Sequence, residues 1–225
     1  MEEDCSKKSD IIKISRQLFY TKGYSNTSIQ NIIDIANIAK GTFYHYFKSK
    51  EDLLNQLTDI DVDGLYSVIE KIEKMQIDAK SKLIKIFQSA TSWKNDNISA
   101  LKPLIKVIIS DSNLILRNNI LQHQNSKLAP LYARIISQGV DEGVFHVRDK
   151  EYTSKFLICS FDYYGNQVYK FFEQSTYSKV IEDEFINLLR NFEDTIERLL
   201  GTHSGSIKIA EDEIVRNLYR GLMEA

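Results

Sequence analysis

Proline is nearly absent from this chain, and its scarcity constrains the fold more than any other feature. The 225 residues contain 2 prolines and 9 glycines, so few positions carry the residues that end helices. Residues 54–225 show no strand-like alternation of polar and apolar residues and no glycine-rich phosphate loop. We therefore expect an all-α protein built from long helices.

The first two helices can be placed from their ends. Apolar residues repeat with helical spacing over residues 8–22, and Gly23 suits a left-handed C-terminal cap. A few residues later, the stretch Thr27-Ser28-Ile29-Gln30 fits a capping box with Thr27 as the cap. We predict a second, short helix from there to about Ala36.

A tight turn and a third helix follow. Asn37 tolerates the left-handed backbone region that such a turn needs. In the aromatic run FYHYF, Phe43 and Phe47 are four residues apart and are predicted to face a small core. The side chains left pointing outward are those of Lys40, Thr42, Tyr44 and His45.

Charge is distributed unevenly along the chain. Between residues 7 and 50 the sequence has eight cations and two anions, a net charge of +6, whereas the whole chain has a net charge of −2. A basic N-terminal module on an acidic body favours a polyanion as partner of that module.

A fourth helix is predicted after Lys48 with Ser49 as its cap. Lys50 then lies at the positive end of the helix dipole, where a bound phosphate would stabilise it.

A short helix, a tight turn and a second short helix together form a helix-turn-helix, whose second helix enters the major groove of DNA. Lys40 and Thr42 lie at the start of that helix and are the candidates for base edges. Gly41 has no side chain, so its backbone can approach DNA closely. Tyr44 and His45 can donate hydrogen bonds to phosphate oxygens.

The stretch LFYTKGYSNTSIQNIIDIANIAKGTFYHYFKSKEDL, residues 18–53, resembles the N-terminal signature of the TetR family of bacterial transcriptional regulators (TetR/AcrR type). The match needs no gap. It departs from the signature at Asn37, where glycine is usual, and at Ala39, where a small polar residue is usual. The resemblance implies a three-helix DNA-binding domain over residues 1–53 and a larger helical ligand-binding and dimerisation domain over residues 54–225.

The resemblance also implies a function. Proteins of this family are homodimers that usually repress transcription, bind a palindromic operator in double-stranded DNA and release it when a small molecule binds. Thr27 and Ser28 would meet phosphate at the start of the second helix. Carried over by position, the DNA-contacting residues are Thr27, Ser28, Lys40, Gly41, Thr42, Tyr44, His45 and Lys50.

The remainder of the chain continues the helical pattern. We predict helices over residues 79–94, 101–108, 113–141, 150–174, 178–200 and 207–223, with a break at 138–147 and a polar linker at 201–206. Pro130 is expected to kink or divide the third of these helices. The resemblance implies that the helices at 150–174 and 178–200 form a four-helix bundle in the dimer.

Effector binding leaves little trace in the sequence. Aromatic side chains at Trp93, Tyr132, Phe161 and Tyr164 are candidates for the wall of an apolar pocket, and the alternative is that they are ordinary core residues. The histidines after residue 120 are dispersed and the two cysteines fit neither a disulfide framework nor a metal site. No metal or other cofactor is expected.

Two other classes of function are left open. One is an all-helical enzyme and the other a protein–protein adaptor, each with an incidental basic N-terminus. No pair of catalytic groups has a spacing that favours the enzyme, so we expect a protein without enzymatic activity. No apolar run reaches the roughly 18–20 residues of a membrane span, and the polar N-terminus does not resemble a signal peptide, so a cytoplasmic location is expected.

Overall fold

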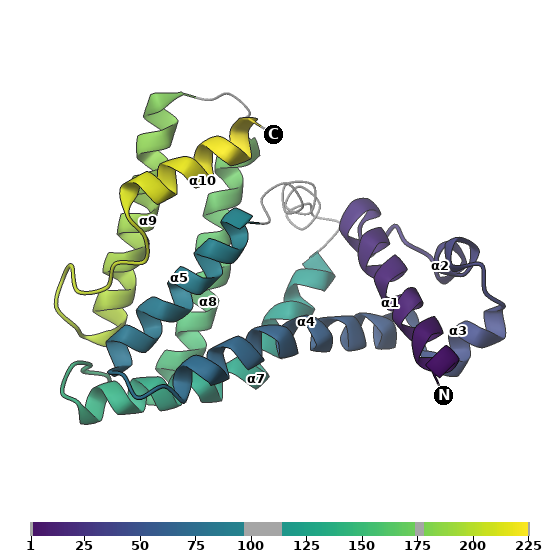
Figure 1. Ribbon diagram of the computed structural model, residues 1–225, viewed down its shortest axis with the longest axis horizontal. Coiled ribbons are helices and arrows are strands. Elements are labelled where there is room, and N and C mark those ends of the chain that lie inside the picture. Colours follow the sequence, from purple (N-terminus) through teal and green to yellow (C-terminus); the bar gives the residue numbers. More distant parts are fainter. Residues whose placement is uncertain (1, 97–113, 174–177, 225) are drawn as a thin grey trace. The chain divides into compact units, whose positions relative to one another are not determined.

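The computed structural model describes residues 2–96, 114–173 and 178–224, and all the regular secondary structure in these ranges is helical (Figure 1). The helices are α1 (Glu2–Lys22), α2 (Ile29–Ala36), α3 (Lys40–Tyr46), α4 (Lys50–Glu73), α5 (Ala79–Asp96), α7 (Leu114–Asp141), α8 (Lys150–Glu173), α9 (Lys179–Leu200) and α10 (Asp212–Glu224). The prediction of an all-α fold is confirmed. The helix predicted at 101–108 lies outside the described residues.

The chain forms two compact units. We call the first unit the head; its described residues are 2–63 and 114–123. We call the second unit the body; its described residues are 64–96, 124–173 and 178–224. Since the division falls inside α4 and inside α7, each of these helices contributes residues to both units. The sequence placed the boundary at 53/54, before most of α4.

The head is built on a small apolar core. In Figure 1, α1 lies against α2, which is followed by α3. Phe43 and Phe47 are fully buried, as predicted, and they share the core with Phe19 of α1 and Leu54 of α4. Burying each of these large side chains stabilises the fold by roughly 1.5–3 kcal/mol. The aromatic run therefore fixes α3 on the head through two of its rings.

The beginning of α7 is part of the head. Leu116 is fully buried in the head core. The amide of Asn119 donates to Asn55 Oδ1 of α4 at 2.6 Å, and His123 Nδ1 lies 3.0 Å from Asp59 Oδ1. These contacts join residues 64 apart in the sequence, and no local sequence pattern predicts them.

In the body, α7 runs through Pro130 without a break, so of the two predicted outcomes, a kink or a division of the helix, the division does not occur. An internal proline costs about 3 kcal/mol in a helix. Leu131 and Tyr132, directly after it, are buried, as is Ala129 before it. The burial of these neighbours offsets that cost and keeps the helix continuous.

The C-terminal segment corrects a second prediction, because α10 begins at Asp212 and not at residue 207. The backbone amides of Gly205 and Ile207 donate to the Glu197 carboxylate at 2.9 and 2.7 Å. The amide of Ile209 donates to Glu193 at 2.6 Å. Carboxylates on α9 thus take the amides that a helix would have bonded to its own carbonyls, and residues 203–211 pack along α9 without helical structure.

Candidate nucleic-acid interface

The turn between α2 and α3 has the geometry of a helix-turn-helix. Asn37 adopts φ 50° and ψ 50°, and among the described residues it is the only non-glycine with positive φ. Its amide bonds the Asp34 carbonyl at 3.3 Å, and the amide of Ile38 bonds the Ile33 carbonyl at 3.2 Å. The predicted left-handed turn at Asn37 is confirmed.

The start of α2 differs from the prediction by one residue. Ser28 is the N-terminal cap: its hydroxyl accepts from the Asn31 amide at 3.1 Å, and Asn31 Oδ1 accepts from the Ser28 amide at 3.0 Å. The predicted box with Thr27 as cap and Gln30 as its partner is therefore wrong. Asparagine was not recognised as the third member of a capping box, although its carbonyl oxygen can accept the same hydrogen bond.

The outer face of α3 carries the predicted contact residues. Lys40, Gly41, Tyr44 and His45 are exposed, and Thr42 is half-buried. A Cβ added at Gly41 would meet nothing within 4 Å, so the backbone there is open to an incoming surface. Since Phe43 and Phe47 hold the opposite face of α3 in the core, the polar groups have a fixed direction.

The head carries further exposed cations besides those of α3. The exposed lysines of the head are Lys7, Lys13, Lys22, Lys40 and Lys48. Lys48 lies between α3 and α4 and was not among the predicted contacts, although its charge and its place beside the aromatic run were visible in the sequence. Lys8 is half-buried, with its ammonium 5.9 Å from the centre of the Phe47 ring. The exposed cations can neutralise phosphates.

Thr27 and Lys50 are placed differently from the other six predicted contacts. Thr27 is buried, and its hydroxyl donates to the Gly23 carbonyl at 2.8 Å. Lys50 is half-buried, and its ammonium donates to the carbonyls of Tyr24 and Thr27 at 2.8 and 2.9 Å. Ser28, by contrast, is exposed at the start of α2, where a phosphate contact is predicted.

The candidate effector residues of the body lie together in an aromatic cluster. The ring of Phe161 lies 5.8 Å from that of Tyr132 and 5.8 Å from that of Phe192, and Tyr164 stacks on Phe192 at 4.3 Å. Burial raises the pKa values of the Tyr132 and Tyr164 hydroxyls, so both are neutral at physiological pH. The side chain of Trp93, the fourth candidate, lies outside the described part of the chain.

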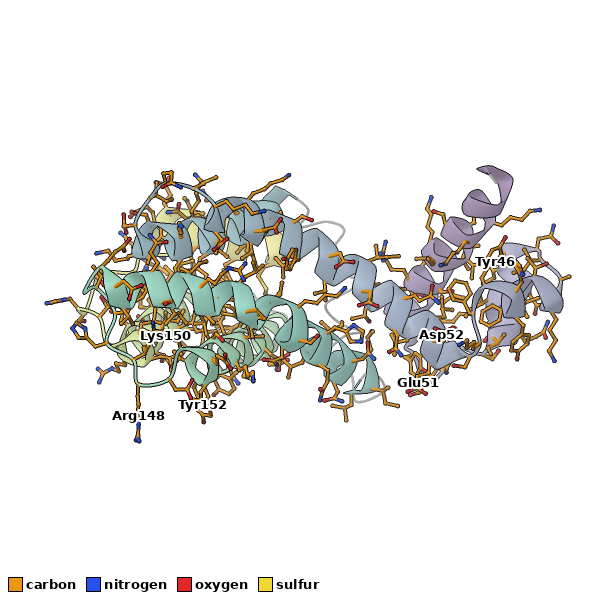
Figure 2. The ribbon with its side chains drawn as sticks, turned by 90° about the horizontal axis from the view of Figure 1, so that it is seen from below. Tyr46, Glu51, Asp52, Arg148, Lys150 and Tyr152 are labelled. Atoms are coloured by element: carbon orange, nitrogen blue, oxygen red, sulfur yellow. The ribbon has the colours of Figure 1, made fainter. Side chains whose placement is uncertain are left out.

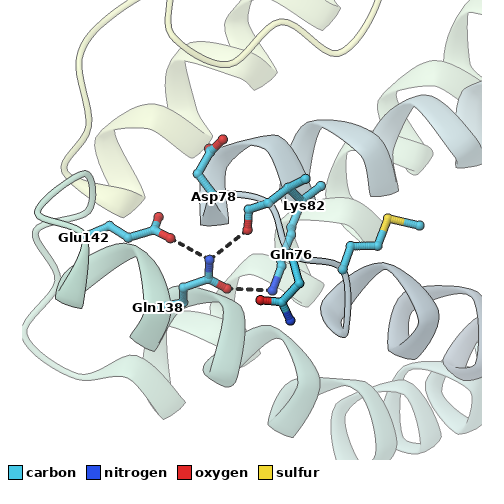
Figure 3. Close-up of a pocket in the computed structure, with 7 residues that line it drawn as sticks. Gln76, Asp78, Lys82, Gln138 and Glu142 are labelled. Carbon is cyan, nitrogen blue, oxygen red and sulfur yellow. Dashed lines mark hydrogen bonds between the residues drawn. The ribbon is translucent and has the colours of Figure 1, made fainter.

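A cavity of about 470 Å³ in the body is lined by polar groups from the turn after α4, the start of α5 and the end of α7 (Figure 3). Gln138 is at its centre: it accepts from the Lys82 ammonium at 2.7 Å and donates to the Ile77 carbonyl at 2.9 Å and to Glu142. Glu142 also accepts from the amide of Ala79 at 2.9 Å. The side chains of Lys82, Gln138 and Glu142 thus link the turn after α4, the start of α5 and the end of α7, and we call this set of contacts the junction.

Two other kinds of site are not found in the described residues. No group of three or more histidine, cysteine, aspartate or glutamate side chains there is arranged to hold a metal ion. Within the same ranges, no helix has the length and apolar character needed to span a membrane.

Two family models match the chain. The model for bacterial regulatory proteins of the tetR family matches residues 11–57, which contain α2, the turn and α3. The model for the tetracyclin repressor-like C-terminal domain matches residues 96–185. Both models thus describe the same kind of regulator, one over the N-terminal part of the chain and one over its middle.

The chain is also similar to individual regulators. The HTH-type transcriptional repressor KstR2 of Rhodococcus jostii is 23% identical over 67% of this chain and 74% of its own length. The FadR regulator of Bacillus subtilis, solved with stearoyl-CoA, has a TM-score of 0.60 and 22% identity, covering 87% of this chain and 99% of that one. RolR, solved with resorcinol, has a TM-score of 0.63 and 16% identity, covering 95% of each chain. The two solved structures share the fold of this chain.

Proposed function

The chain belongs to the TetR family of helix-turn-helix transcriptional regulators, and we propose that it is a repressor that binds a palindromic DNA operator as a homodimer in the cytoplasm and releases it when a small molecule binds. The observation that carries the proposal is the division of α3 into a buried face with Phe43 and Phe47 and an exposed face with Lys40, Gly41, Tyr44 and His45. We assign it no catalytic role.

The proposed DNA contacts differ in kind. Lys40 and Thr42 at the start of α3 read base edges, and Ser28, Tyr44 and His45 position the head by bonding phosphates. Gly41 lets the helix backbone approach the groove, and Lys48 is added as a phosphate contact. Two heads of a dimer place two α3 helices in successive major grooves, so the half-sites are about one helical turn apart or a multiple of it.

Selection of sites from random duplex DNA tests this proposal directly. We expect a palindrome to be enriched and its affinity to fall steeply with salt. Lys40→Ala removes a base contact and lowers affinity for the selected palindrome by roughly tenfold or more. Lys71→Ala makes the same charge change at an exposed position of the body and leaves that affinity nearly unchanged. A folded dimer that enriches no sequence would favour the enzyme or the adaptor.

Dimerisation is proposed through α8. Tyr152, Phe156 and Tyr163 lie on one face of this helix with 66%, 49% and 66% of their surface exposed, and Cys159 is exposed among them. Figure 2 labels Tyr152 near the start of the helix. A stripe of exposed aromatic side chains favours burial against another protein surface, and a second copy supplies the same stripe.

The dimer proposal has two readouts. Phe156→Glu introduces a charge into the stripe and is expected to give monomers in sedimentation, whereas Lys155→Glu at the adjacent exposed position is the matched control. In a Cys5→Ser background, alkylation of Cys159 is expected to be slow in the wild-type dimer and fast in the Phe156→Glu variant. Equal alkylation rates would place the interface elsewhere.

The effector is proposed to enter the aromatic cluster of the body. Phe161 contacts rings on both sides, so an apolar molecule that replaces one of these contacts must also shift α8. Resorcinol and stearoyl-CoA, found in two proteins of the same fold, are the first probes. Binding is followed by the fluorescence of Trp93, the single tryptophan, and by release of the selected operator. A Phe161→Ala variant that responds like the wild type would exclude this location.

A further inference from the structure

We infer that Lys50 is a positioning residue, whose ammonium fixes the turn between α1 and α2 and thereby sets the direction in which α2 and α3 are presented to DNA. The resemblance implied instead that Lys50 contacts phosphate. This inference rests on the proposed DNA-binding function, and it assigns to Lys50 a role inside the head.

The Lys50 ammonium is directed into the head. It donates to the Tyr24 carbonyl at 2.8 Å and to the Thr27 carbonyl at 2.9 Å. It also lies 4.2 Å from the centre of the Tyr24 ring, within the range of a cation–π contact. The side chain is half-buried, and this burial lowers the pKa of the ammonium.

The N-terminus of α4 already has its own anion. Asp52 accepts from the backbone amide of Lys48 at 2.7 Å, and its own amide bonds the Ser49 hydroxyl at 3.0 Å. Figure 2 shows Asp52 and Glu51 together at this helix end. The carboxylates stabilise the positive end of the helix dipole, so no bound phosphate is needed to explain a lysine there.

The turn held by Lys50 leads directly into α2. Gly23 has φ 88°, and the carbonyl of Tyr24 accepts from the Thr27 amide at 3.2 Å as well as from Lys50. Thr27 is followed at once by Ser28, the N-terminal cap of α2. Lys50, the first residue of α4, is therefore bonded directly to the residues that lead into α2.

The Tyr24 ring also ties the turn to the head core. It packs edge-on against Phe19 in the head core, with ring centres 5.1 Å apart. The turn is thus held between a core contact and a lysine on α4. Any change in the position of α4 at Lys50 moves the start of α2, and α3 moves with it because α2 and α3 are joined by the fixed turn at Asn37.

The test compares Lys50→Met with Lys48→Met, which removes an exposed lysine two residues away. Affinity for the selected palindrome is measured over a range of salt concentrations, and amide hydrogen exchange is measured at residues 24–31. A lysine that neutralises a phosphate contributes about 0.9 to the slope of log K against log salt. We expect Lys48→Met to reduce the slope by about that amount and to leave exchange in the turn unchanged.

Lys50→Met is expected to do the reverse. The slope stays at its wild-type value, the amides of the turn exchange faster, and affinity falls by about tenfold, a typical coupling between two parts of a protein. A reduced slope with unchanged exchange would make Lys50 a phosphate ligand and overturn the inference. Faster exchange with unchanged affinity would also overturn it, because the turn would then not position α2.

A second variant covers the case in which Lys50→Met does not fold. Lys50→Arg keeps the charge that a phosphate needs but replaces the rotatable ammonium by a longer planar group. A phosphate ligand predicts unchanged affinity in this variant, whereas a positioning residue predicts that affinity falls in step with faster exchange in the turn. If the wild type binds no DNA, the proposed function fails, while the exchange data still decide whether Lys50 holds the turn.

Discussion

Lys50 in the head and Lys82 in the body both lie near the start of a helix, Lys50 as the first residue of α4 and Lys82 as the fourth residue of α5. Each lies in the first turn, α4 for Lys50 and α5 for Lys82, where the helix dipole disfavours a cation. Each ammonium donates to main-chain carbonyls that precede its own helix. Lys50 bonds Tyr24 and Thr27 in the turn before α2, and Lys82 bonds the carbonyl of Glu73, the last residue of α4.

The two lysines differ in burial and in their second partner. Lys82 is only 6% exposed and shares its charge between the Glu73 carbonyl and the side chain of Gln138, whereas Lys50 is half-buried and bonds two carbonyls. A lysine in the first turn of a helix is therefore weak evidence for a bound anion. Carbonyl groups at the end of a neighbouring segment carry the partial negative charge that such a lysine needs.

The largest effect is expected from Gln138→Leu. It removes an acceptor from a buried ammonium and leaves the Ile77 carbonyl without the Gln138 donor, so we expect a loss of about 3 kcal/mol in the free energy of unfolding. Urea unfolding measures it. Gln122→Leu, at an exposed position of α7 in the head, is the control, and equal losses in both variants would contradict the role of the junction.

Lys82→Met is expected to cost less, about 2 kcal/mol, because the charge disappears together with its hydrogen bonds. Combined with Gln138→Leu, it should cost clearly less than the sum of the two single losses, since each change removes the same contact. Lys85→Met, exposed on the same helix, should remain within about 0.5 kcal/mol of the wild type. Additive losses in the double variant would show that the two side chains act independently.

The next prediction concerns the carboxylate of Asp78, which directly precedes α5. Its side chain accepts from the amide and the hydroxyl of Ser81 at 2.8 and 2.6 Å, and these bonds lower its pKa below the ordinary 3.8. Asp78→Ala should cost about 1 kcal/mol at pH 7. Because the folded pKa is depressed, the ionised form contributes stability above pH 3.8 that is lost as the pH falls through the folded pKa.

Urea unfolding of both proteins across that pH range measures the difference. The difference in the free energy of unfolding between the wild type and Asp78→Ala should become smaller as the pH is lowered. If that difference stays constant, Asp78 stabilises the start of α5 through its hydrogen bonds alone, without a contribution from the charge of its carboxylate.

The smallest effect is expected from Asp52→Asn in the head. Hydrogen bonds from the Lys48 amide and from Gln56 lower the pKa of this carboxyl, but the group is close to solvent. Removing its charge should cost about 0.5 kcal/mol in urea unfolding at low salt and less at high salt. A loss as large as that of Gln138→Leu would contradict the expectation that the carboxylate of Asp52, close to solvent, contributes less to stability than the contacts of Gln138 with the buried Lys82.

The helix-turn-helix was predictable because its signals are local. A left-handed residue at position 37, a cap before α2 and two phenylalanines four residues apart each depend on neighbours within one or two turns of helix. The glycine at position 201 ended its helix in the same way, with φ 62°. The cap was misplaced by one residue because Thr27 and Ser28 are chemically alike, and the buried contact of Thr27 with the Gly23 carbonyl decided between them.

Other features depended on partners far along the chain. Residues 207–211 have a helical pattern, but Glu193 and Glu197 bind the amides of Ile209 and Ile207, and the segment is not helical. Leu116 belongs to the head core although it lies 63 residues after the end of the predicted domain at 1–53. No local pattern in the sequence signals a contact between residues so far apart.

The sequence by itself determined the helices, the turn at Asn37 and the polar face of α3, because propensity, capping and periodicity act between residues that are close along the chain. The tertiary structure decided what each charged side chain binds. Lys50 reaches carbonyls 23 and 26 residues away, and Lys82 reaches an amide oxygen 56 residues away. A charge is stabilised by whichever partner the fold brings within about 3 Å, and that partner has no fixed spacing in the sequence.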